Sequence, residues 1–406
     1  MTFKVDIRQV THSFSDALDL VGIDEVQHGK RVAFMALTCG KEMNLDPTNL
    51  ERIYHASLLH DCGVSSTQIH RKLVTELDWS GSQEHCIRGE KLLEQCRPFS
   101  DLALIIRYHH THWEDLPLDL APDVALISNL IYLTDRVDAL IAQHGGNNIL
   151  HTRHIIFETI KKYRGIFFST ELTDIFLNVA NSEYFWLMLD PRHLSRFIVE
   201  MEKEPKSQYV DRNTFLKMAT IFAEIVDAKS PFTIEHSLGV SRLARYIGDL
   251  VGLSKDKQYK LEVAGLLHDL GKLNVPDEIL EKPGPLTLEE RMVMMRHSFE
   301  SYQILSRISG FEDIAKWAAF HHEALAGNGY PFHKDKKELS LEARIVAIAD
   351  VFQALAQNRP YRDSLPKDEI LFIIDEMVAK GTLDPQLVAL TKTYSEKCLQ
   401  CANCIG

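Results

Sequence analysis

The sequence predicts an all-α protein made of two tandem, duplicated helical domains. Long stretches repeat apolar residues every three or four positions, as in FLKMATIFAEIVDA (215–228) and LEARIVAIADVFQALA (341–356), which is the spacing of helices with a buried face. The chain has only 20 Gly and 14 Pro among 406 residues, and strand-like alternation is scarce. A set of histidines and aspartates also recurs at matching intervals in both halves, which predicts the duplication.

Composition limits the class of protein. A chain of 406 residues suits two domains of about 200 residues each, and contents of 45% hydrophobic and 25% charged residues are those of an ordinary globular protein. No run of apolar residues is long enough for a membrane span, and the start MTFKVDIRQVTHS lacks the apolar core of a signal peptide, so we expect a cytoplasmic protein without a membrane contact. The formal net charge of −12 argues against binding of nucleic-acid polymers. An anionic ligand would therefore need local cations.

Histidines and aspartates mark the two copies of the repeat. An interval of 32 residues separates the first two histidines of each copy, and an interval of 24 separates the third from the fourth. The matching residues are His28, His60, Asp61, His85, His109, His110 and Asp135 in the first copy, and His236, His268, Asp269, His297, His321, His322 and Asp350 in the second. We therefore expect domains at 1–200 and 205–395, joined by the charged stretch EMEKEPKSQ (200–208).

The chain ends in a cysteine-containing segment, residues 396–406. Its CLQCANC motif carries Cys398, Cys401 and Cys404, a spacing that suits zinc or an iron–sulfur cluster, but no fourth ligand follows nearby. Seven cysteines in a chain without a secretion signal do not describe a disulfide framework. We expect a frayed tail with incidental thiols.

The seven residues of the second copy form a candidate metal site. One histidine on an apolar helix is usually a hydrogen-bonded core residue, and one aspartate is usually a cap or an ion-pair partner. Five imidazoles and two carboxylates together are costly to bury unless something compensates them. They exceed the needs of one ion, and an adjacent His-Asp pair suits two ions with a bridging carboxylate. Such ligands favour iron or manganese, with nickel or zinc as alternatives, and two ions promote displacement at phosphorus.

Several motifs of the second half resemble the HD-GYP family, a branch of the HD-domain metal-dependent phosphohydrolases. They are HDLGK (268–272), HHEALAGNGYP (321–331), SPFTIEHSLGVSRLA (230–244), LNVPDEILEKPGPLTLEE (273–290), MRHSFESYQIL (295–305) and ADVFQALAQNRPYR (349–362). The resemblance covers residues 215–390. It implies an all-helical fold and hydrolysis of cyclic dinucleotides, chiefly cyclic di-GMP, whereas some tandem-domain members act on 3′3′-cyclic GMP-AMP (3′3′-cGAMP). The tandem arrangement narrowly favours 3′3′-cGAMP.

The resemblance also implies roles for single residues. The first ion would be bound by His236, His268, Asp269 and Asp350, and the second by His297, His321 and His322, with Asp269 as the bridge. Lys272 and Asp269 would act in catalysis, because the ammonium group of Lys272 would stabilise charge on a phosphate oxygen. The substrate would also contact Gly329, Tyr330 and Pro331, beside Gly327, and the arginines Arg359 and Arg362. The GYP loop is implicated in partner contact as well. The simpler readings are a surface lysine, an ordinary turn and exposed arginines.

Three positions depart from the family pattern. Ala324 and Ala326 occupy places where members often have Arg and Asp. Phe232 replaces a glutamate that binds a third ion in some members, which favours two ions here. Gln353 replaces a common aspartate. These changes leave the ligand set intact, but the substrate preference does not follow from the family pattern.

The first copy keeps its seven ligand-type residues but has Val64 where the second copy has Lys272. No GYP loop follows HHTHWEDLPLDLAP (109–122). Two interpretations stay open: a degenerate metal site without efficient catalysis, or a scaffold whose polar residues are hydrogen bonded. The stretch DIFLNVANSEYFWLML (174–189) fits either the core, which we favour, or a face between paired domains.

The leading functional hypothesis is a metal-dependent cyclic-dinucleotide phosphodiesterase that releases a linear, 5′-phosphorylated dinucleotide. A nucleotidase or another phosphomonoesterase is the alternative enzyme. A non-catalytic signalling module that binds a protein partner is the alternative from another class. The sequence is compatible with a homodimer but does not require one.

Overall fold

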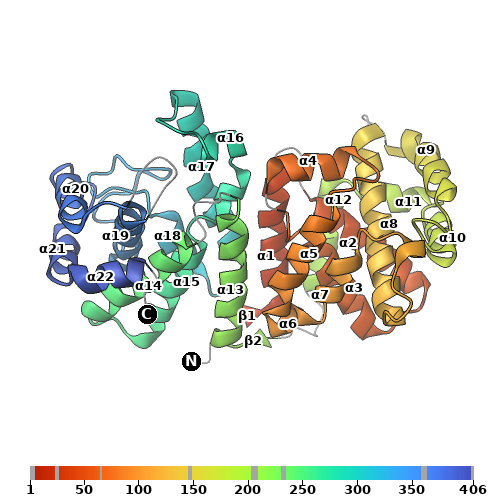
Figure 1. Cartoon of the computed structure of the whole chain (residues 1–406), viewed down its shortest axis with the longest axis horizontal. Coiled ribbons are helices and arrows are strands. Elements are labelled where there is room, and N and C mark those ends of the chain that lie inside the picture. The colour runs from red at the N-terminus through yellow and green to blue at the C-terminus, as the bar shows by residue number, and fades with distance from the viewer. Residues whose placement is uncertain are drawn as a thin grey trace. The chain divides into compact units, whose positions relative to one another are not determined.

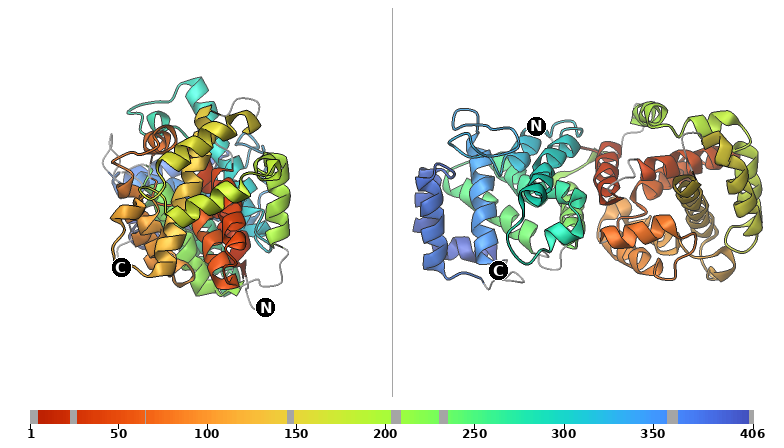
Figure 2. Two further views of the ribbon diagram at one scale, coloured as in Figure 1. Left: turned by 90° about the vertical axis from the view of Figure 1, so that its right-hand side faces the viewer. Right: turned by 90° about the horizontal axis from the view of Figure 1, so that it is seen from above.

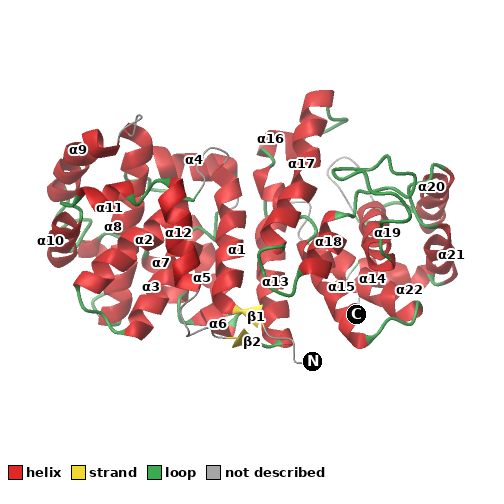
Figure 3. Cartoon of the chain, turned by 180° about the vertical axis from the view of Figure 1, so that it is seen from behind, coloured by secondary structure: helices red, strands yellow, loops and turns green. Residues whose placement is uncertain are grey.

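The computed structural model describes residues 5–22, 27–64, 66–144, 149–202, 209–229, 235–357 and 364–403 (Figure 1). It divides into two compact units, with the boundary between Thr214 and Phe215. Residues 209–210 belong to the first unit because they pair with residues 5–6, so this boundary lies beyond the charged stretch 200–208. Helices dominate both units, and the described residues contain only two strands of two residues each (Figure 3). The predicted all-α class is confirmed.

The N-terminal unit begins and ends with the short strands of an antiparallel pair, in which Val5 lies opposite Val210. Helices of the 3₁₀ type carry the label η. The elements are β1 (Val5–Asp6), α1 (Ile7–Asp19), η1 (Leu20–Gly22), α2 (His28–Glu42), α3 (Pro47–Leu59), α4 (Thr67–Thr75), α5 (Gln83–Glu94), α6 (Arg97–Ser100), α7 (Ala103–Tyr108), η2 (Trp113–Asp115), α8 (Pro122–His144), α9 (Ile149–Lys162), α10 (Thr170–Val179), α11 (Glu183–Leu187), α12 (Pro191–Glu202) and β2 (Tyr209–Val210).

Helix α8 is the centre of this unit. It contacts α2, α3, α4, α7 and α9, and its middle residues are buried on every side. The right-hand view of Figure 2 shows this yellow helix nearly end-on, with other helices around it. In the stretch 174–189, Phe176, Phe185 and Trp186 are buried while Tyr184 and Leu187 are exposed. The aromatic part of this stretch therefore packs in the core, as we favoured.

The C-terminal unit is built in the same manner around α19, which contacts α14, α15, α18, α20, α21 and α22. The elements are α13 (Arg212–Asp227), α14 (His236–Leu250), α15 (Lys255–Leu267), η3 (Leu270–Asn274), α16 (Asp277–Leu280), α17 (Leu288–Leu305), α18 (Glu312–Ala319), α19 (Leu341–Ala356), α20 (Lys367–Ala379), α21 (Pro385–Thr393) and α22 (Ser395–Ala402). The two helices expected at 215–228 and 341–356 are α13 and α19.

Local sequence fixes where the site-bearing helices begin. The side chain of Ser340 accepts a hydrogen bond from the backbone of Ala343 and so caps α19, and Thr287 forms a capping box with Glu290 at the start of α17. None of the helices in the described part of the chain combines the length and apolar character needed to span a lipid bilayer.

The end of the chain differs from the expected frayed tail. Residues 395–402 form α22, which packs against α14 and α19. The Cys398 side chain is fully buried, and Cys401 is partly buried. An apolar face on the last turns explains the difference, because burying Cys398 and Ala402 stabilises a helix that sequence composition alone leaves undecided. Cys404 lies outside the described residues.

Candidate metal centres

Six helical elements bring the seven predicted ligand residues of the C-terminal unit together. His236 is the first residue of α14, the pair His268 and Asp269 links α15 to η3, and His297 lies on α17. His321 and His322 follow α18, and Asp350 lies in the middle of α19. Apart from the partly buried His322, all of these side chains are buried. We call this set the C-terminal centre.

Asp269 lies between two groups of imidazoles. Its Oδ2 is 3.2 Å from Nε2 of His268 and 3.4 Å from Nε2 of His236. Its Oδ1 is 3.5 Å from Nε2 of His297 and 3.8 Å from Nε2 of His321, and it has no hydrogen-bond partner among the described residues. Asp350 adds an oxygen 3.3 Å from Nε2 of His236. One carboxylate thus faces both groups, which is the arrangement that a bridging ligand needs.

Hydrogen bonds donated by Nδ1 fix the orientation and the tautomer of these rings. The rings of His268, His297 and His321 each donate from Nδ1 to the carbonyl oxygen three residues earlier, and His236 donates to the side-chain oxygen of Gln353. In the neutral ring Nε2 then carries only a lone pair. Nε2 of His236 nevertheless lies 3.2 Å from Nε2 of His268, and the same distance separates His297 from His321.

Two lone pairs at that distance repel unless a cation or a proton lies between them. Three features fit a divalent metal ion: the Nε2 atoms that face one another, the Asp269 oxygen without a hydrogen-bond partner, and the hydrogen bonds that orient the rings through Nδ1. Three groups of three ligand atoms each converge closely enough to hold one: His297, His321 and His322; His236, His268 and Asp350; and His268, Asp269 and His321. The predicted set is therefore brought together completely.

The histidines on the two sides of this centre have pKa values shifted in opposite directions. Burial lowers the pKa of His297 to about 3 and that of His322 to about 4, so these rings stay neutral. Burial also acts to lower the pKa of His268, but Asp269 and Asp350 outweigh it and raise the pKa to about 10. The pKa of Asp269 is held well below its usual range, since its cationic neighbours outweigh the opposing effect of burial. A metal ion bound beside Asp269 and Asp350 would take the place of the additional proton on the His268 ring.

Lys272 and the GYP loop lie at the edge of the C-terminal centre. The Nζ atom of Lys272 is 2.5 Å from Oδ2 of Asp269, and its side chain is partly exposed. The ring of Tyr330 lies 4.7 Å from that of His322, and the Tyr330 amide donates to the His322 carbonyl. A Cβ at Gly329 would lie 2.4 Å from Cα of Glu323, so only glycine fits there. The predicted Arg359 and Arg362, and Phe232, lie outside the described residues.

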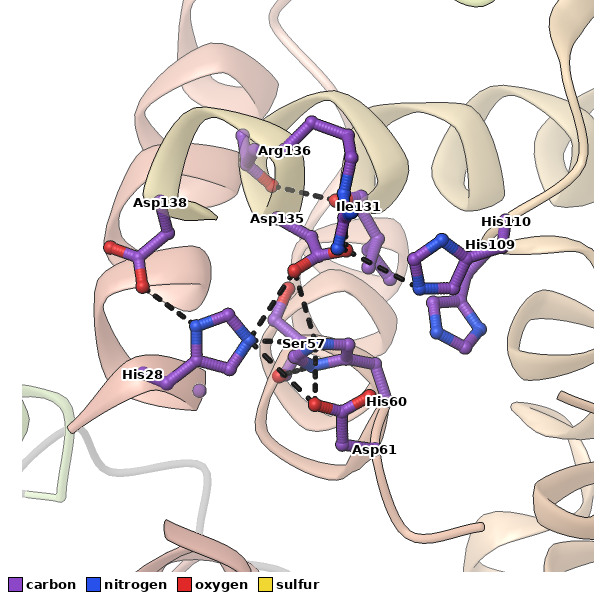
Figure 4. Close-up of polar contacts among 12 residues, drawn as sticks. His28, Ser57, His60, Asp61, His109, His110, Ile131, Asp135, Arg136 and Asp138 are labelled. Carbon is purple, nitrogen blue, oxygen red and sulfur yellow. Dashed lines mark hydrogen bonds and ion pairs between the residues drawn. The ribbon is translucent and has the colours of Figure 1, made fainter. Parts of the chain in front are cut away.

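The N-terminal unit brings its own seven residues together, in a set that we call the N-terminal centre. Figure 4 shows His28, His60 and Asp61 facing Asp135 of α8. Oδ1 of Asp135 is 3.4 Å from Nε2 of His28, and Asp61 spans to both sides, with Oδ2 3.6 Å from His60 and Oδ1 3.5 Å from His85. Nε2 atoms again meet, at 3.1 Å between His28 and His60 and 3.2 Å between His85 and His109. His110 lies 3.4 Å from Oδ2 of Asp135.

Comparisons with known proteins agree with this arrangement. Models of the HD domain match residues 26–142 and 220–387, one in each unit. The 3′3′-cGAMP-specific phosphodiesterase 1 of Vibrio cholerae is 34% identical over 404 residues, which cover 98% of this chain and 94% of that protein. The chain belongs to the HD-GYP family.

Other HD-GYP relatives match over different shares of the chain. The 3′3′-cGAMP-specific phosphodiesterase 3 of V. cholerae is 30% identical over 76% of this chain and 66% of its own length. A cyclic di-GMP phosphodiesterase response regulator of Xanthomonas campestris is 41% identical over 37% of this chain and 40% of its own length. A crystal structure of a cyclic GMP-AMP-specific phosphodiesterase of V. cholerae aligns with 100% of this chain and 99% of its own, at a TM-score of 0.68 and 25% identity.

Four residues that lie at the two centres were not singled out as site residues by sequence reasoning. They are Gln353, which was noted only as a departure, and Cys86, Arg136 and Asp138 of the N-terminal unit. Gln353 follows Asp350 by three positions, as Asp138 follows Asp135, and both contact Nδ1 of the first histidine of their copy. A spacing of three residues puts two side chains on one face of a helix. This spacing is the signal that could have identified Gln353 and Asp138.

Proposed function

We propose that the C-terminal unit hydrolyses a cyclic dinucleotide, with 3′3′-cGAMP preferred over cyclic di-GMP, to a linear 5′-phosphorylated dinucleotide. The observation that carries the reaction class is the position of Asp269, whose two oxygens face two separate groups of imidazoles while Lys272 lies against it. The substrate preference follows the relatives. The 3′3′-cGAMP-specific relative covers 98% of the chain, whereas the cyclic di-GMP response regulator covers 37%.

The ligand sets that we propose keep the predicted division. His236, His268, Asp269 and Asp350 would hold one divalent ion, and His297, His321 and His322 the other, with Asp269 shared. Two such ions supply an activated water and stabilise negative charge during in-line displacement at phosphorus. Nitrogen and oxygen donors without a thiolate favour iron or manganese, with nickel or zinc as alternatives.

The protein's own side chains would then position and stabilise the substrate. The Lys272 ammonium, partly exposed beside Asp269, can turn to a non-bridging phosphate oxygen and offset its charge. Tyr330 on His322, with Gly329 and Pro331, would form one wall of the site, and Arg359 and Arg362 would form a cationic wall for the dinucleotide. The GYP loop as a protein-binding element, a homodimer and a cytoplasmic location stay predictions of the sequence.

A substrate panel tests this proposal. The protein, purified without oxygen and supplied with iron or manganese, would be given 3′3′-cGAMP, cyclic di-GMP, cyclic di-AMP or a phosphomonoester, and the products separated by chromatography. We expect metal-dependent opening of 3′3′-cGAMP to a linear dinucleotide with a 5′-phosphate, and no product from Asp269→Ala. Preference for the monoester would instead show a phosphomonoesterase. Bound metal without turnover of any substrate would show a signalling module.

A further inference from the structure

The two centres differ at the residue that follows their third histidine. Cys86 follows His85 on α5, whereas Ser298 follows His297 on α17. The Cys86 side chain is fully buried, and its Sγ lies 3.8 Å from Nε2 of His85 and 3.6 Å from Nδ1 of His109. The three side chains converge closely enough to hold one metal ion. The N-terminal centre therefore offers a sulfur ligand that the C-terminal centre lacks.

The surroundings of His85 also point to a ligand. Its Nδ1 is buried and has no hydrogen-bond partner among the described residues, while its Nε2 lies 3.2 Å from Nε2 of His109. The His109 ring donates from Nδ1 to the carbonyl of Ile106, so its Nε2 carries a lone pair. An oxygen of Asp61 lies 3.5 Å from Nε2 of His85 and would be a fourth donor. Zinc bonds of about 2.0–2.3 Å in a tetrahedron place ligand atoms about 3.5 Å apart, which matches the distances of Nε2 of His85 from Nε2 of His109 and from the Asp61 oxygen.

We propose that the N-terminal unit holds a resident metal ion on His85, Cys86, His109 and Asp61, and that the cysteine makes this site prefer zinc. Thiolate with imidazole is a zinc set, whereas the serine at the same place in the C-terminal centre leaves only nitrogen and carboxylate donors. Binding would release the thiol proton, because the metal ligand is the thiolate.

The proposed ion would serve stability and not catalysis. Val64 replaces the lysine, and the guanidinium of Arg136 is committed to Oδ2 of Asp135 at 2.8 Å and to the carbonyl of Glu76 at 2.8 Å. The cavity lined by His28, Asp61 and His70 measures about 10 Å³, which is room for about one water. The described residues that line this cavity include no lysine or arginine to contact a phosphate, and a dinucleotide does not fit in it.

The test uses the full chain with the C-terminal centre disabled by His268→Gln, Asp269→Asn and His321→Gln, which together remove a ligand from each of its three groups, so that the metal counted belongs to the N-terminal unit. Supplied with equal zinc and manganese, this protein is expected to retain a single Zn²⁺ per chain. Loaded with Co²⁺ instead, it should show the near-ultraviolet charge-transfer band of a cobalt–thiolate bond. Cys86→Ser should remove the band and lower the retained ratio of zinc to manganese about tenfold or more.

Cys39→Ser is the matched control, because Cys39 is equally buried but lies three helical turns along α2 from His28. It should keep the band and the zinc. A disabled chain that retains no zinc, or a cobalt band that survives Cys86→Ser, would overturn the proposal. If Cys86→Ser does not fold, as judged by circular dichroism, the metal content and cobalt spectrum of the disabled parent still decide, since the proposal requires both.

Discussion

The carboxylates of the two centres have different cationic neighbours. In the N-terminal unit, Arg136 pairs with Asp135, and Arg31 pairs with Asp138 through two hydrogen bonds of 2.6 and 2.8 Å. In the C-terminal unit Asp350 is followed by Val351, and the ion pair described at the centre is that of Lys272 with Asp269. Arg136 is buried and the side chain of Arg31 is 15% exposed, whereas that of Lys272 is 23% exposed.

This difference shows what the duplication kept and what it changed. Both copies keep imidazole pairs 3.1–3.2 Å apart and a carboxylate that faces both groups. Of the three cations described at these centres, Lys272 has the most exposed side chain, which leaves it room to turn from its carboxylate to a substrate. A ligand set alone therefore does not define a catalytic centre, and substitutions at four pairs of equivalent positions can test how the two units differ in catalysis, metal binding and stability.

The largest effect is expected on turnover, from substitutions at the equivalent positions Lys272 and Val64. Lys272→Met should lower kcat for the cyclic dinucleotide by about 10²–10³, because a charge-stabilising group is lost in the transition state. Its metal content should be unchanged. The reciprocal Val64→Lys should add no activity in a chain whose C-terminal centre is disabled. Steady-state kinetics with metal analysis would measure both, and full turnover by Lys272→Met would separate the lysine from catalysis.

The second-largest effect is expected on metal binding, from substitutions at the equivalent positions Gln353 and Asp138. Gln353→Leu removes the acceptor that holds Nδ1 of His236, so the affinity of the C-terminal centre for Mn²⁺ should fall about 10–100-fold. Asp138→Leu removes the acceptor for His28 and should leave the C-terminal centre unaffected. Titration with Mn²⁺ would check this, and equal effects of the two substitutions on that centre would contradict it.

Gly239 and Arg31 occupy equivalent positions, three residues after the first histidine of each copy. A Cβ at Gly239 would lie 2.3 Å from the carbonyl oxygen of Ala402, so Gly239→Ala should displace α22 and destabilise the C-terminal unit by about 1–3 kcal/mol. Gly40→Ala is the control, because its Cβ would meet only side-chain ends at 3.0 Å. Denaturant unfolding would compare them, and α22 would prove dispensable if Gly239→Ala were the milder change.

The smallest effect concerns Lys229, which corresponds to Val21 in the first unit. Burial lowers the pKa of Lys229 from 10.5 to about 8, and its ammonium donates to the carbonyl of Leu273. The unfolded chain binds more protons between these two pKa values, so this group makes stability rise with pH there, by at most about 1.4 kcal/mol per pH unit. Lys229→Met should remove that rise. Unfolding midpoints at pH 7.5 and 9.5 would show it, and an unchanged slope would place the lysine in solvent.

Much of the fold and of the candidate site could be predicted from the sequence. The apolar spacing located α19 at its observed bounds, and the intervals between histidines identified all seven residues of each centre. Residues whose role depends on packing between distant elements could not be predicted. Arg136 reads as a surface arginine until α8 is seen to be buried, and α22 reads as a loose tail until Cys398 meets α14 and α19.

The central claim is that the C-terminal centre does the chemistry and the N-terminal centre does not. Asp269→Asn and Asp61→Asn make the same change at equivalent bridging positions. Turnover of 3′3′-cGAMP by each, with the metal content of each, is the most direct measurement. We expect Asp269→Asn to lose turnover by about 10³ or more and Asp61→Asn to keep most of it. Loss of turnover in folded Asp61→Asn, or its survival in Asp269→Asn, would contradict the account.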